Sequence, residues 1–166
     1  WSDTQTPGSS LELYYMKLDN NGNTLVPATR LTFTSGAAGN PSLDLDSSNN
    51  VHIVWQEDKI GYWQLYYTKL DNNGNTLVDD KRLTFDNALS GYASLVTDAY
   101  NNVHIVWDDD RDGIYKGEIY YTKLDNNGNT IVDDTRLTFD PHNSWFPSLA
   151  TDSNSNVHIV WAEYKT

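Results

Sequence analysis

Short runs of apolar and aromatic residues, separated by polar turns, recur along the whole chain. In one stretch they are Ser42–Asp46, Val51–Trp55, Gln64–Leu70 and Arg82–Phe85. The second run is almost continuously apolar, as expected of a strand covered on both faces, and the third is rich in tyrosine. Turn residues bound all four runs, and none has a helical period. The pattern therefore predicts four short β-strands in succession.

This four-strand pattern is present three times. The sequence VHIVW recurs at offsets of 52 and 54 residues, beginning at Val51, Val103 and Val157. The sequence RLTF recurs with the same offsets, beginning at Arg30, Arg82 and Arg136. Units of about 50 residues with four strands each are the sequence pattern of β-propeller blades. We therefore predict an all-β propeller, with a stacked solenoid as the alternative.

The repeat also predicts how the chain divides into blades. Complete blades are expected over residues 42–85 and 94–139, with half-blades over 1–33 and 148–161. Trp1 aligns with Trp107, at the end of a second strand. The first half-blade therefore supplies the third and fourth strands of a blade, and the last half-blade supplies the first and second. In closed propellers the termini often share one blade in this way. Three blades are too few to close a ring, so we expect the half-blades to meet head to tail between chains.

Two chains joined in this way would form a six-bladed ring, which is the arrangement we favour. Three chains, an open filament, or a place in a longer propeller are the alternatives. Composition restricts the other partners. The chain has 166 residues, a formal charge of −12 and a pI of about 4.4, so nucleic acid and anionic membranes are disfavoured. No apolar run approaches the about 18 residues of a membrane helix, and we expect no membrane insertion.

The chain contains no cysteine, which excludes disulfides and thiolate metal sites. Its acidic composition, rich in Asn, Thr and Tyr, is typical of a prokaryotic extracellular or cell-surface module. The heptapeptide LDNNGNT, which starts at Leu18, Leu70 and Leu124, invites comparison with calcium loops. An EF-hand loop needs Gly at its sixth position and Glu at its twelfth. Counted from the Asp of the heptapeptide, the Gly is at the fourth position and an Arg is at the twelfth.

The heptapeptide is therefore predicted to be a hairpin turn, with Asn-Gly at its centre and both residues at positive φ. The Asp and Thr side chains would bond neighbouring backbone amides. A weak cation site of another kind is the alternative. We expect neither a metal ion nor a cofactor.

The chain resembles the Asp-box (BNR-like) β-propellers of bacterial and archaeal cell surfaces. The resemblance rests on YYTKLDNNGNTLV and PSLATDSNSNVHIVW, and it covers all three units. Asp71, Gly74 and Thr76 match the Asp box in kind. Lys69 and Leu77 depart from it, and one extra residue separates Asp from Gly. The resemblance implies a propeller, and the family includes sialidases and other glycoside hydrolases as well as binding modules.

Two sets of repeated residues could carry chemistry. His52, His104 and His158 could converge on a metal ion, but their place in a buried strand predicts hydrogen-bonded structural histidines. Arg30, Arg82 and Arg136 could bind a carboxylate as sialidase arginines do. Their equivalent positions instead predict structural ion pairs, with Asp79-Asp80 and Asp133-Asp134 as partners. No nucleophile or pair of acids stands out, so we expect a non-catalytic module.

The loops that differ between units are expected to share one face of the propeller. They are Thr34–Asn40, Gln56–Trp63, Asp86–Tyr92, Asp108–Lys116 and Asp140–Phe146. Loops on a rigid scaffold often carry function, and aromatic residues beside carboxylates suit sugar rings. The candidate ligand-binding residues are Tyr62, Trp63, Tyr92, Asp109, Arg111, Tyr115, Trp145 and Phe146. Packing between blades is the alternative role for these rings.

The expected function is therefore ligand binding, with a glycan as the favoured ligand, or self-assembly. The alternatives are a fragment of an Asp-box glycoside hydrolase and a purely structural ring or filament subunit.

Overall fold

The computed structural model describes residues 2–3, 11–33, 35–59, 61–113, 116–139 and 141–164. Over these residues the protein consists of strands arranged in four antiparallel sheets, which confirms the all-β prediction. The described part of the chain forms no helix, and so none that is long and apolar enough to cross a membrane.

Each sheet is built from strands that follow one another along the chain. The first sheet has three strands, β1 (Ser2–Asp3), β2 (Glu12–Leu18) and β3 (Thr24–Arg30). The second has four, β4 (Ala38–Leu45), β5 (Val51–Glu57), β6 (Gln64–Leu70) and β7 (Thr76–Arg82). The third also has four, β8 (Ser90–Thr97), β9 (Val103–Asp109), β10 (Glu118–Leu124) and β11 (Thr130–Arg136). The fourth has two, β12 (Ser144–Thr151) and β13 (Val157–Glu163).

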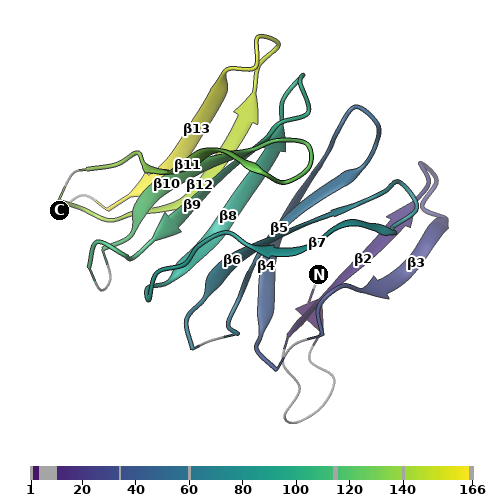
Figure 1. Ribbon diagram of the computed structural model, residues 1–166, viewed down its shortest axis with the longest axis horizontal. Coiled ribbons are helices and arrows are strands. Elements are labelled where there is room, and N and C mark those ends of the chain that lie inside the picture. The colour runs from purple at the N-terminus through teal and green to yellow at the C-terminus, as the bar shows by residue number, and fades with distance from the viewer. Residues whose placement is uncertain are drawn as a thin grey trace.

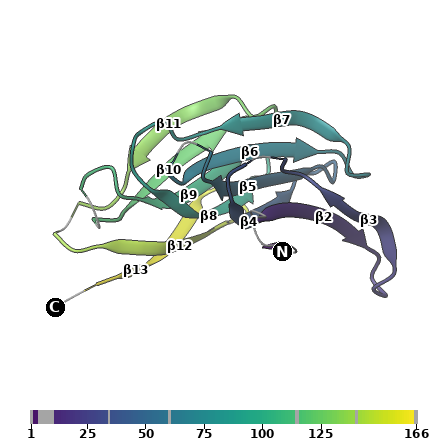
Figure 2. The same ribbon diagram turned by 90° about the horizontal axis from the view of Figure 1, so that it is seen from below.

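The sheets follow one another in chain order, from the N-terminal sheet at one side to the C-terminal sheet at the other (Figure 1). The first strands of the last three sheets are neighbours, because β8 packs between β4 and β12. In Figure 2 the strands of the second sheet succeed each other from β4 to β7, and those of the third from β8 to β11. Each complete sheet therefore runs from an inner strand to an exposed outer strand.

The core lies between neighbouring sheets and centres on β5 and β9, whose residues are all buried. Trp55 and Trp107 are each 1% exposed and stack on Tyr66 and Tyr120, with ring centroids 5.9 Å apart in both cases. These second strands are paired on both edges and covered on both faces. Their continuous apolar pattern follows from that position.

The fourth strand of each unit was predicted incorrectly. The strand is β7 (Thr76–Arg82) rather than Arg82–Phe85, and Leu83 to Phe85 follow it outside any strand. As an outer edge strand with a solvent-facing side, β7 carries charged residues, so apolar periodicity does not reveal it. The RLTF segment has a different role. Its Thr84 is buried, and the hydroxyl oxygen accepts a hydrogen bond from the Leu65 amide at 2.9 Å.

The LDNNGNT segments are hairpin turns, as predicted, but their geometry differs from the prediction. Of the two central residues only the glycine has positive φ, which is 86° at Gly74, whereas both were expected to have it. The Asp71 carboxylate accepts bonds from the amides of Asn73 and Asn75, at 2.8 and 2.9 Å, and from the Asn75 side chain at 2.8 Å. These bonds hold the pKa of Asp71 below its usual value. The carboxylate thus stabilises its own turn.

The turns between first and second strands are built in the same way. Asp46, Asp98 and Asp152 accept corresponding bonds from residues two and four positions later. In all six turns an Asp carboxylate therefore accepts the hydrogen bonds of the turn, and we call them Asp-centred turns. Three of them contain no glycine. Asn49, Asn101 and Ser155 take the positive φ that glycine takes in the other three.

The repeated histidines are hydrogen-bonded inside the sheets, which confirms their predicted structural role in β5 and β9. His52 is fully buried, and its Nδ1 lies 2.7 Å from the Tyr67 hydroxyl oxygen. His104 has the same contact with Tyr121 at 2.8 Å. His158, on β13, is largely exposed and lies 3.5 Å from Asp152.

Replacement of Tyr67 by Phe is expected to lower the free energy of unfolding by about 1–3 kcal/mol, because it leaves a buried His52 nitrogen without its partner. Chemical denaturation followed by tryptophan fluorescence measures the change. Tyr62→Phe is the control, since Tyr62 is 45% exposed and its loss should change stability by less than about 0.5 kcal/mol. Equal losses in the two variants would contradict the role of the buried bond.

Candidate functional site

Three residues with unusual backbone conformations mark the start of the inner strands. Asn40, Tyr92 and Phe146 occupy equivalent positions in β4, β8 and β12, with φ of 49°, 49° and 55°. Each lies where the pairing with the second strand shifts its register, as at a β-bulge. Positive φ is uncommon for residues other than glycine, and such positions cluster at functional sites. A bulge also redirects a side chain.

Because β4, β8 and β12 are neighbours, the three bulges come together. Asn40, Tyr92 and Phe146, with the residue that follows each, line a hollow of about 310 Å³. Tyr92 and Phe146 meet edge to face, with ring centroids 4.9 Å apart, and they are 45% and 57% exposed. The Trp145 ring lies 6.4 Å from that of Phe146. The predicted residues Tyr92, Trp145 and Phe146 thus form one aromatic group.

A buried carboxyl group lies beside this aromatic group. Asp108, near the end of β9, is 3% exposed and accepts a hydrogen bond from the Phe146 amide at 3.3 Å. It lines a second pocket, of about 230 Å³, together with Leu89, Asp110 and the three aromatic residues. Tyr92 and Phe146 border both pockets.

The electrostatics of Asp108 are unusual. Burial, reinforced by the nearby Asp110 and Asp109 carboxylates, raises the pKa of Asp108 to about 7, and the bond from the Phe146 amide offsets this only in part. At neutral pH the group is therefore divided between its protonated and ionised forms. Such a carboxyl group can both give and take a proton, which is the property of a general acid or base.

The equivalent residue in the second sheet is Gln56, whose side-chain oxygen accepts the Tyr92 amide at 3.0 Å. The contact between sheets is the same in the two places, but an ionisable group has replaced a neutral amide. Asp108 was absent from the residues predicted from sequence. The available signal was this change at one repeat position, where the chain has Gln56, Asp108 and Ala162.

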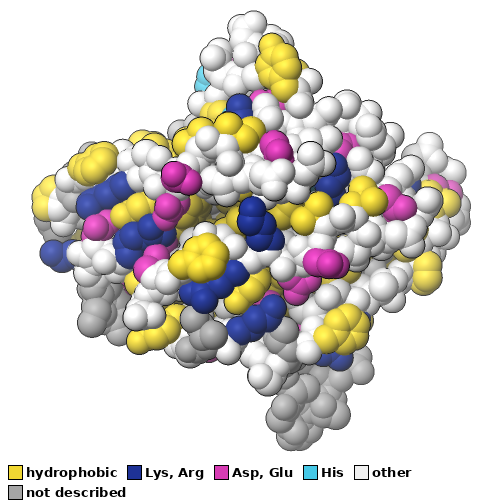
Figure 3. Space-filling view, viewed as in Figure 1, with side chains coloured by type: hydrophobic (Ala, Val, Ile, Leu, Met, Phe, Trp, Pro, Cys, Tyr) yellow, Lys and Arg dark blue, Asp and Glu magenta, His cyan; other side chains and the backbone are white. Residues whose placement is uncertain are grey.

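Two other predicted residues, Asp109 and Arg111, lie in a charged network. Asp109 is fully buried and accepts bonds from Trp107 Nε1 at 2.8 Å and Ser90 Oγ at 2.9 Å. Arg111 contacts the carboxylates of Asp109, Asp86 and Asp134 and lies 4.3 Å from the Tyr120 ring centroid. Figure 3 shows basic and acidic side chains next to one another on the face of the molecule that it presents.

The second sheet contains a similar network. There Lys59 lies between Glu57, at 3.2 Å, and Asp80, at 3.5 Å, and 4.3 Å from the Tyr66 ring centroid. In both sheets the basic residue lies in the loop that follows the second strand, so its contacts hold that loop against the sheet.

Tyr62 and Trp63 line neither of the two pockets. Tyr62 is exposed, and Trp63 is half-buried with its carbonyl accepting the Ser90 amide at 2.9 Å. Tyr115 lies outside the described residues.

The predicted ion pairs form at Arg30 and Arg136, with partners other than the predicted aspartates, whereas the partner of Arg82 is a neutral side chain. Arg30 and Arg136 pair with Glu12 and Glu118, and Arg82 bonds the Gln64 side chain at 3.0 Å. These partners lie on the adjacent third strand, which the sequence spacing does not reveal. Among the described residues, no three His, Cys, Asp or Glu side chains are grouped so that they could hold a metal ion.

Comparison with solved structures shows that the fold is a β-propeller. One similar structure is an endo-arabinase from Bacteroides thetaiotaomicron VPI-5482, with a TM-score of 0.59 and 12% identity, covering 92% of this chain and 61% of that one. Another is a thermostable family-43 glycoside hydrolase, with a TM-score of 0.55 and 10% identity, covering 93% and 62%. The chain thus spans about three fifths of the length of these structures. No family model and no curated protein matches the sequence.

These findings correct the expected function. The sequence pattern favoured a non-catalytic binding module and argued against an enzyme, whereas both similar structures are glycoside hydrolases. The expectation rested on the apparent absence of a pair of acids. It treated Asp108 only as part of a variable loop, because burial, rather than a local motif, gives this carboxyl group its properties.

Proposed function

We propose that the chain is a catalytic carbohydrate-active module that hydrolyses glycosidic bonds at the pockets around Asp108. The observation that carries the proposal is a buried carboxyl group, with a pKa of about 7, beside three clustered aromatic residues. Glycosidases use a carboxylic acid of raised pKa to protonate the leaving oxygen. Asp108 is assigned this role of general acid.

The other residues of the pocket supply what the reaction needs besides the acid. Asp110 borders the same pocket, and it provides a second carboxylate to act on water or on the sugar. Tyr92, Trp145 and Phe146 offer partly exposed ring faces against which the apolar face of a sugar can pack. The two pockets on either side of the Tyr92–Phe146 pair place these rings in direct reach of a bound saccharide.

The similar structures suggest the first substrates to examine. Because one of them is an endo-arabinase, linear arabinan and its oligosaccharides come first, followed by other chromogenic glycosides. An extracellular location, inferred from composition, suits a module that acts on polysaccharide. The relationship to Asp-box propellers stays a prediction from the sequence motifs.

The test is release of reducing ends from arabinan and from a glycoside panel by the purified chain. Tyr92→Ala should raise KM about 2- to 13-fold, since an aromatic contact contributes roughly 0.5–1.5 kcal/mol. Tyr100→Ala is the matched control, because Tyr100 is 76% exposed on a turn between β8 and β9 at the opposite end of the strands. Absence of hydrolysis across the whole panel would refute the proposal, and so would equal effects of the two tyrosine substitutions.

A further inference from the structure

The last strand, β13, exposes residues that are buried wherever else they occur in the repeat. Val160 is 67% exposed, whereas the equivalent Val54 and Val106 are fully buried. Trp161 is 42% exposed, whereas its equivalents in β5 and β9 are 1% exposed. One edge of β13 pairs with β12, and the other pairs with no strand of the described chain. An apolar strand with a free edge is therefore open to a partner.

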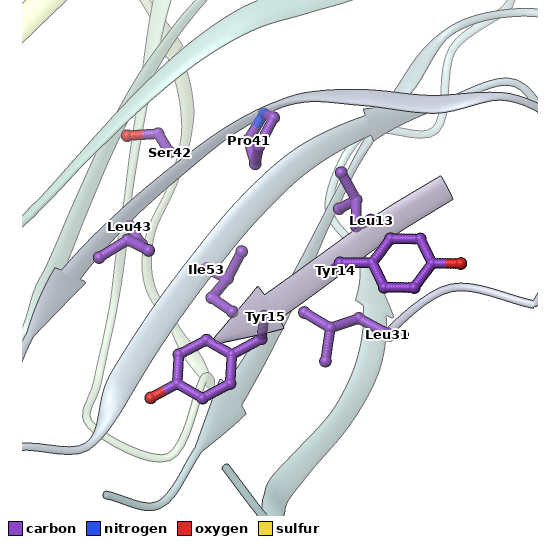
Figure 4. A pocket seen from close by; sticks show the side chains of 8 residues that line it. All are labelled: Leu13, Tyr14, Tyr15, Leu31, Pro41, Ser42, Leu43 and Ile53. Atoms are coloured by element: carbon purple, nitrogen blue, oxygen red, sulfur yellow. The ribbon is translucent and has the colours of Figure 1, made fainter. Parts of the chain in front are cut away.

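At the other end of the molecule a groove leaves open an apolar surface that is filled elsewhere in the repeat. It lies between the first and second sheets, has a volume of about 250 Å³, and is lined mainly by apolar side chains (Figure 4). Those used in the argument are Leu13, Tyr15, Pro41, Leu43 and Ile53. Leu43 is 56% exposed, although the equivalent Leu95 is 5% exposed.

The repeat identifies the side chain that fits this groove. One unit further along the chain, the residues equivalent to the groove lining are Leu65, Tyr67, Ala93, Leu95 and Ile105. All five belong to one buried cluster, and Val54 is a member of that cluster. The cluster that contains Leu13, Tyr15 and Ile53 has no residue equivalent to Val54. The groove therefore has the lining that elsewhere surrounds the second-strand valine.

The strand that borders this groove also has most of one edge unpaired within the described chain. β1 pairs with β2 only at Leu13 and Glu12. In the second sheet β5 pairs with β6 along its whole length, from Val51 opposite Leu70 to Glu57 opposite Gln64. The same register would place β13 along all of β2, with Val160 opposite Tyr15.

Polar side chains on the two edges match as well. Lys69 Nζ lies 3.0 Å from Asp46, and His52 Nδ1 lies 2.7 Å from the Tyr67 hydroxyl, in the complete second sheet. The equivalents of Lys69 and Tyr67 are Lys17 and Tyr15 on β2.

The equivalents of Asp46 and His52 lie on the other half, as Asp152 and His158 on the β12–β13 hairpin. Lys17 already makes the other contacts of its repeat position, bonding the carbonyl and side chain of Asn72 as Lys69 bonds those of Asn126. The two halves thus carry opposite members of the same ion pair and the same hydrogen bond.

We propose that β13 of one copy of this chain adds to β2 of a second copy, so that Val160 fills the groove and the two halves form one four-stranded sheet. The incoming strand replaces β1 at Leu13 and Glu12. The two halves lie at opposite ends of the molecule in both views, so one copy cannot join its own ends (Figures 1 and 2). The contact is head to tail, and two copies joined at both ends form a closed ring.

The first test is the mass in solution, measured by light scattering after size-exclusion chromatography. The expected mass is that of two chains, each of 18.8 kDa. Val160→Arg should raise the dissociation constant about 100-fold or more and leave a single chain, because an unpaired charge cannot be buried in an apolar groove. Leu77→Arg, at a 54% exposed position on β7, is the control and should keep the native mass. A single-chain mass for the native protein overturns the proposal, as does an assembly unaffected by Val160→Arg.

The second test separates the two sides of the contact. Leu43→Arg blocks the groove but leaves β13 intact, whereas Val160→Arg does the reverse. Each variant alone should be a single chain, and an equimolar mixture should form a two-chain complex through one intact contact. Circular dichroism verifies that both variants remain folded. A mixture that stays monomeric overturns the pairing of this strand with this groove. Because neither test measures hydrolysis, the result is independent of the proposed activity.

Discussion

Replacement of Asp108 by Asn is expected to raise the free energy of unfolding at pH 8 by about 2–4 kcal/mol and to lower kcat about 10²–10⁴-fold. The pKa of Asp108 is raised to about 7 from its ordinary value of 3.8, chiefly by burial. Between these two values the folded protein keeps a proton that the unfolded chain releases. Stability therefore falls as the pH rises from about 4 to about 7, and the loss is complete above pH 7. Asn is neutral throughout and can still accept the Phe146 amide.

Denaturation curves from pH 4 to pH 8 measure the stability, and reducing-end release measures the activity. The gain in stability should fall below about 1 kcal/mol near pH 4, where Asp108 is protonated in the folded protein and about half protonated in the unfolded chain. Gln56→Glu is the converse control, because it places a carboxyl group at the equivalent buried position and should lower stability at pH 8. A stability difference that does not vary with pH would contradict the raised pKa. Unchanged kcat would remove Asp108 from the reaction.

Replacement of Trp107 by Ala is expected to lower the free energy of unfolding by about 3–5 kcal/mol, the range for a large aromatic residue removed from a core. Trp107 is 1% exposed, belongs to the cluster between the second and third sheets, and stacks on Tyr120. Its Nε1 also donates to the buried Asp109 carboxylate at 2.8 Å. The substitution removes packing and a buried hydrogen bond together.

Trp161→Ala is the matched control for this substitution, because Trp161 has the same repeat position but is 42% exposed. Both variants are best measured by urea denaturation in the Val160→Arg background, where association of copies does not bury Trp161. The expected loss for Trp161 is below about 1 kcal/mol. Similar losses at the two positions would show that the sheet interface does not determine the stability.

The parts of the fold that could be predicted from sequence are those that repeat. VHIVW identifies β5 and β9 because a doubly covered strand needs a continuous apolar run, and the same sequence identifies β13. β7 was misplaced because an outer strand is mostly polar and has no such pattern. Likewise, Asn40, Tyr92 and Phe146 share one bulge without sharing a residue type. The shared backbone position is seen only in the structure, where the register of strand pairing shifts at each of the three residues.

The candidate site was predicted in part for a related reason. Tyr92, Trp145 and Phe146 were recognised because they are aromatic residues in loops that differ between units. Asp108 acquires its properties from contacts with β12 of the next sheet, and no local pattern around it indicates them. Asp109 was predicted to bind a ligand, but its carboxylate accepts hydrogen bonds from Trp107, Ser90 and Arg111 and so stabilises the sheet. Both acids are buried, and they differ in their partners, which cannot be deduced from composition.

The Asp-centred turns have a consequence for the order of folding. Each is held by bonds within five residues, so its hairpin can form in about 1–10 μs without help from another sheet. The hairpins are also nearly alike, so each meets several chemically similar neighbours, in its own chain and in others. We therefore expect the choice among these neighbours, rather than the formation of the hairpins, to limit the rate of folding. It also makes chain concentration a determinant of the folded yield.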